Sequence, residues 1–167
     1  SPEQAKAIKD GLDYVESRIR HYLEVITTDA LFLSRTRNIG TISKEEAERF
    51  GLLGPTARAS GLGRDVRVDA AYGAYKKFPI NAVVETNGDL EARCVVRLKE
   101  LLVACFSIRT ILDNLPEGPL TVRMPRKIPA GETIARIEAP RGELLYFIKS
   151  NGGETPARVH VRTPSLC

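Results

Sequence analysis

The sequence is poor in the residues that hold metals or form disulfides, with three cysteines, two histidines and no tryptophan among 167 residues. Cys94, Cys105 and Cys167 show no metal-ligand spacing and form no even set of the kind that a disulfide framework needs. His21 and His160 are far apart in the chain, so no zinc site is predicted within it. This cysteine usage is typical of a reducing, cytoplasmic compartment.

Long hydrophobic runs are also missing. The longest, Leu101 to Phe106, is much shorter than the roughly 20 apolar residues that cross a bilayer. The opening residues, Ser1 to Lys9, are polar and do not resemble a secretory signal. The sequence therefore predicts no direct insertion into a membrane.

What is present is typical of a single globular domain over residues 1–167, with 43% hydrophobic and 28% charged residues. The net charge is +4, and arginine outnumbers lysine by 17 to 8. No lysine- and arginine-rich run or other nucleic-acid-binding pattern is found, so nucleic acid is not an expected partner. Because arginine suits bidentate and partly buried contacts, we expect an anionic pocket or a partner surface instead.

Two long helices are predicted in the first two thirds of the chain. Apolar residues recur with a 3.6-residue spacing from Pro2 to Thr27, which indicates an amphipathic helix. Asp89 is placed to cap a second helix, Leu90 to Asn114, whose apolar positions exceed one stripe and predict a buried, central element. Between them, Leu31–Thr36 adds a helical turn, and Ser43 begins a short helix through a capping box.

The last third changes to strand patterns. The predicted fold class is α+β, with a mainly helical part (1–119) followed by a small, mostly antiparallel sheet (120–167). The predicted strands are Ile80–Glu85, which precedes the second long helix, and then Leu120–Met124, Thr133–Ala139, Glu143–Ser150 and Arg158–Arg162.

The segment Gly54–Asp69 is the least regular part of the chain. It is rich in glycine and carries Arg58, Arg64, Asp65 and Arg67. A long loop of this kind is either functional or a solvated surface loop. We expect it to be ordered only where its side chains pair, for example Asp65 with Arg58 or Arg67.

Two segments carry a family resemblance. The octapeptide IEAPRGEL, Ile137–Leu144, resembles the EAPRG signature of nickel–iron hydrogenase large subunits. The stretch Arg35–Tyr75 resembles the same region of energy-converting membrane-bound hydrogenases, and it is similar to the homologous quinone-pocket subunit of respiratory complex I. The most specific matches are SGxxxDxR, with Ser60, Gly61, Asp65 and Arg67, and EAPRGE, with Glu138 and Arg141.

The resemblance implies roles for five residues near the end of the chain. Arg141 would lie over the Ni–Fe centre, hydrogen-bond an iron-bound cyanide and serve as a candidate base in dihydrogen splitting. Pro140 and Leu144 would line the same active-site wall, together with Pro164 and Ser165. A planar guanidinium with several donors is chemically suited to an anionic diatomic ligand.

The resemblance also implies what this piece lacks. Hydrogenases hold their metals with two CxxC motifs, and this chain contains neither. We therefore expect the fragment to bind no metal or other cofactor itself, and the Ni–Fe centre would belong to a full-length parent that has those motifs. The abrupt first and last residues favour a fragment of a longer large subunit, inactive in isolation.

The implied function is catalysis in a respiratory-type hydrogenase, with dihydrogen oxidation or proton reduction coupled to a membrane ion pump. The implied partners are an iron–sulfur small subunit and other subunits of a membrane-bound complex. The implied location is cytoplasmic, peripheral to the membrane.

Two alternatives remain open. One is the complex I-like subunit of an NADH–quinone dehydrogenase, which contributes to the quinone pocket and the iron–sulfur subunit interface. Arg141 in place of lysine, Ser165 in place of glycine and NGDLEARCVV from Asn87 to Val96 favour the hydrogenase branch. The other is a non-catalytic module, in which Arg58, Arg64, Asp65 and Arg67 form a docking surface for an adjoining iron–sulfur subunit. The residues assigned to a loop that is structural or lies at a subunit interface are Arg58, Ser60, Asp65, Arg67 and Glu138.

Overall fold

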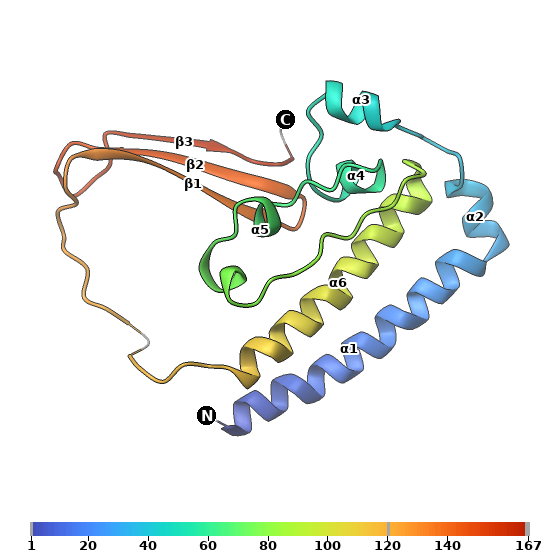
Figure 1. The fold of residues 1–167 in the computed structure, drawn as a ribbon, viewed down its shortest axis with the longest axis horizontal. Coiled ribbons are helices and arrows are strands. Elements are labelled where there is room, and N and C mark those ends of the chain that lie inside the picture. The colour runs from blue at the N-terminus through green and yellow to red at the C-terminus, as the bar shows by residue number, and fades with distance from the viewer. Residues whose placement is uncertain (1, 120, 166–167) are drawn as a thin grey trace.

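The computed structural model describes residues 2–119 and 121–165 and confirms the α+β class, with a helical part followed by a three-stranded sheet (Figure 1). The helices are α1 (Pro2–Thr28), α2 (Ala30–Thr36), α3 (Lys44–Arg49), α4 (Gly54–Ala59), α5 (Val66–Asp69), the 3-10 turn η1 (Gly73–Lys76) and α6 (Leu90–Asp113). The strands are β1 (Gly131–Ala139), β2 (Gly142–Ser150) and β3 (Arg158–Arg162).

The two long helices, α1 and α6, lie side by side and antiparallel (Figure 1). Leu12 and Ile19 of α1 pack with Cys105 of α6, and burial raises the pKa of that thiol. Arg109 of α6 reaches back to Asp13 of α1 at 2.7 Å, which links the helices outside their apolar seam. Among the helices of the described residues, none combines the length and hydropathy needed to span a bilayer.

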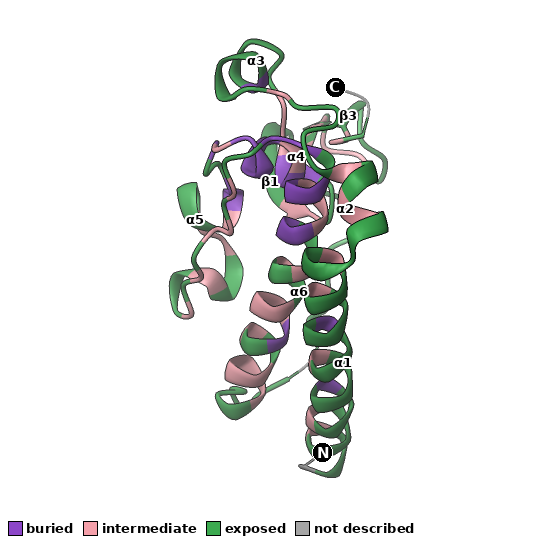
Figure 2. Cartoon of the chain, turned by 90° about the vertical axis from the view of Figure 1, so that its right-hand side faces the viewer, coloured by how far each residue is buried: buried purple, intermediate pink, exposed green. Residues whose placement is uncertain are grey.

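A cluster of buried residues lies where α4 meets the first turns of α6. Ala59 packs against Ala92 and Val96, all three of them buried, because small side chains allow the two helices to approach closely. Figure 2 shows that the buried residues gather on α4 and the adjoining end of α6, whereas α1 is mostly exposed. A second buried cluster joins α3 to α4 through Ala47, Ala57 and Leu62.

Asp89 fixes the start of α6 and confirms the predicted cap. One carboxylate oxygen accepts a hydrogen bond from the Ala92 backbone N–H at 2.8 Å, and the other accepts one from the Asn38 N–H at 2.8 Å. Asp89 is 1% exposed, so this single buried side chain ties the segment after α2 to the helix start.

The sheet is antiparallel throughout, in the order β1-β2-β3. Pro140 and Arg141 form the two-residue connection between β1 and β2, as the sequence indicated. The β2–β3 connection is longer and spans residues 151–157. The sheet joins the helical part at its β1–β2 end and extends away from it (Figure 1).

Three local predictions were wrong. The irregular segment Gly54–Asp69 contains two short helices, α4 and α5. Ile80–Glu85 forms no strand. At its end, the Glu85 N–H donates to the carbonyl of Arg58 in α4 at 3.0 Å, and not to a neighbouring strand. Residues 121–124 are not a strand either, and Leu120 lies outside the described residues.

Replacing Asp89 tests this junction. Asp89→Ala leaves the Ala92 and Asn38 N–H groups without their carboxylate acceptor in a buried site, so we expect the free energy of unfolding to fall by about 2–3 kcal/mol. Asp29→Ala is a matched control, because Asp29 also caps a helix, accepting from the Phe32 N–H at 2.7 Å, but is exposed. Urea denaturation of both variants should show a loss below about 1 kcal/mol for Asp29→Ala, and equal losses would contradict the proposed role of burial.

Candidate functional site

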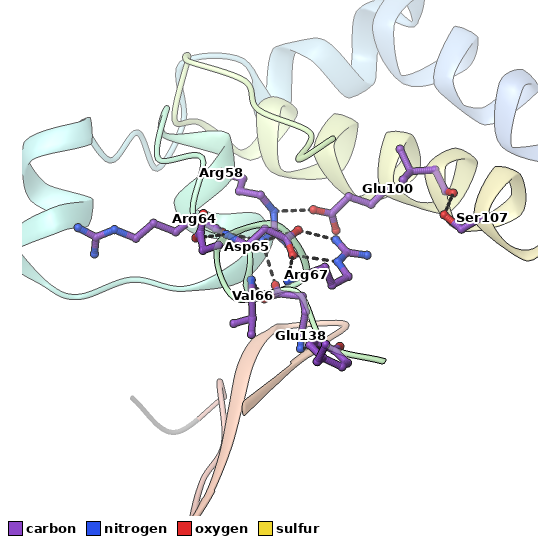
Figure 3. A network of polar contacts seen from close by, with 11 residues as sticks. Arg58, Arg64, Asp65, Val66, Arg67, Glu100, Ser107 and Glu138 are labelled. Atoms are coloured by element: carbon purple, nitrogen blue, oxygen red, sulfur yellow. Dashed lines mark hydrogen bonds and ion pairs between the residues drawn. The ribbon is translucent and has the colours of Figure 1, made fainter. Parts of the chain in front are cut away.

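A buried arginine lies at the centre of the site. Arg58 of α4 is 1% exposed, and its guanidinium donates to Glu100 of α6 at 2.6 Å and to Glu138 of β1 at 2.9 Å. A third donated bond reaches the Arg64 backbone carbonyl at 3.0 Å, and Asp65 lies at 3.5 Å (Figure 3). One side chain therefore connects α4, α6, β1 and the loop before α5.

The second arginine of the cluster pairs with Asp65. Arg67 donates through Nε at 2.9 Å and through Nη2 at 2.6 Å to the two oxygens of the Asp65 carboxylate. Burial alone would raise the pKa of Asp65, but the hydrogen bonds and charge of Arg67, helped by Arg58, hold it below its usual value. Both pairings expected for Asp65 are present.

Glu138 is held from two sides. One carboxylate oxygen accepts from Arg58, and the other accepts from the Val66 backbone N–H at 3.2 Å (Figure 3). Burial raises the pKa of the Glu138 carboxyl, and Arg58 opposes that shift without cancelling it. Glu138 thus anchors the end of β1 to the helical part three residues before Arg141.

The burial of these side chains argues against the docking alternative. The side chains of Arg58 and Asp65 are 1% and 0% exposed, so neither can touch a partner directly. Ser60 is also buried, and its hydroxyl has no hydrogen-bond partner within residues 2–119 and 121–165. Of the charged residues in this segment, Arg64 has an exposed side chain, and it pairs with Glu48 at 3.1 Å.

A glycine pair presses the β1–β2 turn against the start of α4. At Gly54, with φ of +63°, an added Cβ would lie 2.2 Å from the Arg141 carbonyl oxygen. At Gly142, with φ of +130°, an added Cβ would lie 2.8 Å from the Gly54 nitrogen. Only glycine permits this backbone approach, so the pair fixes where the turn presents Arg141.

The five residues assigned to the active-site wall do come together. A cleft of about 410 Å³ is lined by all five, Pro140, Arg141, Leu144, Pro164 and Ser165. Arg141 is exposed and donates to the Ser165 hydroxyl at 3.3 Å. The cleft combines one guanidinium, one hydroxyl and an apolar wall.

Two residues of the site were missed from the sequence. Burial of Glu100 could not be predicted from the sequence, because a single glutamate on a long helix usually lies on a solvated face. Gly54 was placed in a glycine-rich loop, but its neighbour across the structure, Arg141, is remote in sequence. In both cases the role of the residue depends on a contact with a residue that is distant in the sequence, Arg58 for Glu100 and Arg141 for Gly54.

The described residues do not supply a nickel–iron ligand set. Cys105 is buried between α1 and α6, and Cys94 is half-buried on α6, away from the Arg141 cleft. Cys167 lies outside the described residues. No three histidine, cysteine, aspartate or glutamate side chains within 2–119 and 121–165 are grouped so as to hold a metal ion.

Comparison with known proteins identifies one family. The model of the 49 Kd subunit of respiratory-chain NADH dehydrogenase matches residues 1–128 and 120–167, which together span the chain. A carbon monoxide-induced hydrogenase of Rhodospirillum rubrum is 38% identical over 165 residues. An NADH-quinone oxidoreductase subunit of Bacteroides thetaiotaomicron is 36% identical over 167 residues.

A solved structure shows the same fold. A chain of the membrane-bound sulfane sulfur reductase, an archaeal respiratory membrane complex, matches with a TM-score of 0.88 and 32% identity. The match covers 96% of this chain and 45% of that one. This chain likewise spans only 46% of the hydrogenase and 32% of the Bacteroides thetaiotaomicron protein.

Two glycines with the same backbone conformation test the contact at the turn. Gly54→Ala forces a methyl group into the Arg141 carbonyl, whereas Gly51→Ala, at φ of +64°, meets nothing within 4 Å. Both variants bear the cost of a left-handed alanine, about 1–2 kcal/mol. We expect Gly54→Ala to lose a further 1–3 kcal/mol of unfolding free energy, as overpacking does. Equal losses in thermal or urea unfolding would show that the turn can move away freely.

The buried carboxylate of Asp65 predicts an acid-dependent stability. Because its folded pKa is lowered, its contribution is present above the unfolded value of about 3.9 and is lost as the pH falls through the folded pKa. Asp65→Asn should therefore be less stable than wild type at pH 7, and this difference should shrink below about pH 4. Unfolding curves from pH 7 to 2 measure this, with Asp10→Asn on the exposed face of α1 as control. A constant difference between Asp65→Asn and wild type at every pH would contradict it.

Proposed function

Since this chain belongs to the family of the 49 Kd subunit of respiratory-chain NADH dehydrogenase, we propose that it is the central part of a catalytic large subunit of hydrogenase type. In this proposal the full-length subunit oxidises dihydrogen or reduces protons within a membrane-bound complex. The hydrogenase relative at 38% identity and the EAPRG sequence around Arg141 support this branch.

The observation that carries the proposal is the placement of Arg141. Its guanidinium forms no ion pair with any described residue, although two carboxylates, Glu138 and Glu143, lie within three positions of it in the sequence. Those carboxylates pair with other arginines, Arg58 and Arg162. Arg141 is thereby left to face the cleft, which is what a donor to an anionic ligand requires.

The cleft suits hydrogen-bond donation more than proton abstraction. The Arg141 guanidinium offers several N–H donors in a plane, and the Ser165 hydroxyl lies next to it, at 3.3 Å. Pro140, Leu144 and Pro164 add apolar surface to the same cleft. Arginine stays protonated in almost any site, so we assign Arg141 the role of donor, not of base.

The proposal also includes a metal centre, partner subunits and a location. A nickel–iron centre would supply the redox chemistry, held by residues outside this chain, while Arg141 and Ser165 would donate to its ligands. The proposed partners are an iron–sulfur small subunit and further subunits of the complex. The proposed location is the cytoplasmic side of the membrane, in peripheral association with it.

A second candidate is a quinone-pocket subunit. Several relatives are named NADH-quinone oxidoreductase subunits, at 36% identity for the one from Clostridium beijerinckii. The apolar wall of the Arg141 cleft would also accept a quinone ring, with the guanidinium donating to a quinone oxygen. The two candidates therefore share the cleft and differ in what occupies it.

Arg141→Lys in the full-length complex tests the proposal. Lysine keeps the charge but loses the planar fork, so the donor geometry fails while the exposed turn stays folded. Loss of one preorganised donor predicts dihydrogen turnover lower by about 10²–10³-fold. Hydrogen uptake and evolution should be measured together with nickel content and the assembly of the complex, both of which should be retained.

The control is Arg158→Lys, which makes the same exchange at an exposed position of β3. It should leave turnover unchanged. Turnover of Arg141→Lys within about twofold of wild type would place Arg141 outside the chemistry, because a lost transition-state contact costs well over 1 kcal/mol. A wild-type complex without hydrogen turnover but with quinone reductase activity would favour the second candidate.

A further inference from the structure

A second cleft adjoins the β1–β2 turn. It measures about 460 Å³ and shares Ala139, Pro140 and Arg141 with the first cleft, which also contains Leu144 and Ser165. One face of α6 forms its floor, and Arg141 stands between the two clefts because it lines both. The residues around it are Arg58, Arg67, Arg97, Glu100, Leu101, Ala104, Glu138, Ala139, Pro140 and Arg141.

The charges of this second cleft do not balance. Its lining contains four arginines and two glutamates, and both glutamates, Glu100 and Glu138, are engaged by Arg58. Arg67 is satisfied by Asp65 behind the cleft. Arg97 forms no ion pair with a residue of the described ranges, and its guanidinium donates to the Arg93 backbone carbonyl at 2.9 Å. The cleft is therefore positive at Arg97.

Apolar surface continues from the floor of the cleft along α6. Leu101 is 49% exposed, Ala104 follows one turn later, and Ile108 is 40% exposed one turn beyond that. Residues at this spacing share one face of a helix. Exposed apolar side chains beside a guanidinium that has no ion pair suit a covering segment that carries the opposite charge.

We propose that this second cleft binds an aspartate or glutamate side chain from the rest of the full-length polypeptide, with Arg97 as its partner and apolar neighbours covering Leu101 and Ile108. The inference rests on the proposal that this chain is the central part of a longer subunit. The curated relatives are much longer, since this chain spans 46% of the hydrogenase and 44% of the Clostridium beijerinckii protein. The longer subunit that we propose therefore has further residues that can cover this cleft.

The position and chemistry of the cleft identify the occupant further. It lies where α6 meets the turn that carries Arg141, beside the buried Arg58 cluster, and we therefore assign its occupant to the same polypeptide. A free inorganic anion would leave Leu101 and Ala104 uncovered, whereas a carboxylate on a polypeptide brings apolar neighbours with it. Arginine binds carboxylates through two parallel hydrogen bonds, which gives Arg97 both the charge and the geometry.

Zero-length cross-linking in the full-length complex tests this assignment. Arg97→Lys keeps the positive charge and adds a primary amine. A water-soluble carbodiimide activates a carboxylate within contact distance, the amine attacks it, and an amide forms while the carbodiimide becomes a urea. Mass spectrometry of the digest then identifies both peptides. We expect the introduced lysine to be joined to an aspartate or glutamate of the same polypeptide, outside the 167 residues of this chain.

Arg158→Lys, an exposed position on β3, is the matched control and should not label that carboxylate. A cross-link from position 97 to another subunit would overturn the proposal. A link confined to this chain, for example to Glu100, or no link at all would overturn it equally.

Charge reversal gives an independent measurement. Arg97→Glu places two carboxylates face to face, so the thermal unfolding of the full-length subunit should shift down by several degrees, while Arg158→Glu should not shift it. Equal shifts for the two variants would contradict the assignment. These readouts do not depend on turnover: if Arg141→Lys left dihydrogen turnover unchanged while the cross-link formed, the proposed function would fail and this assignment would stand.

Discussion

The burial of the Arg58 guanidinium is the constraint on which the rest of the structure depends. A charged group that is 1% exposed would destabilise the fold by several kcal/mol unless it were paired. The carboxylates that pair with it come from three separate segments, through Glu100, Asp65 and Glu138. Satisfying one cation therefore requires α6, the loop before α5 and the end of β1 to converge on α4. The sheet, which otherwise extends away from the helices, is attached by this requirement.

The same constraint gives neighbouring residues of one short segment different surroundings. Glu138 lies at the end of β1 and pairs with Arg58 in the buried cluster, while Arg141, in the turn that follows, is exposed and has no ion pair with a described residue. Because Glu138 is anchored and Gly54 meets the Arg141 carbonyl, the turn has little freedom to move. The guanidinium can then face the cleft without being drawn to the nearest carboxylates. Arg141 has no ion pair with a described residue because the nearest carboxylates, Glu138 and Glu143, pair with other arginines.

The sequence predicted those parts of the fold that are set by local spacing. The long helices, the cap at Asp89 and the three strands follow from periodicity and from residues within one turn of each element. The segment Gly54–Asp69 could not be predicted, because its order comes from partners such as Glu100 and Glu138, 42 and 80 positions from Arg58. Ile80–Glu85 has a strand-like composition, but composition does not reveal whether a neighbouring strand exists. The wall residues around Arg141 were predicted through a family resemblance, and their shared cleft is a result of the fold.

A catalytic wall and the ligands of a metal centre place different demands on a chain. Ligands must be soft or ionised side chains at fixed spacing, and the described residues contain no such group. A wall needs only that a donor such as Arg141 be held still and left unpaired, which buried pairs and a glycine contact achieve from within this chain. The two demands can therefore be met by different parts of one polypeptide. Relatives named for different activities can then share this part, since a rigid donor over a cleft is compatible with several occupants. The identity of the reaction would be decided by what the remaining residues place opposite Arg141.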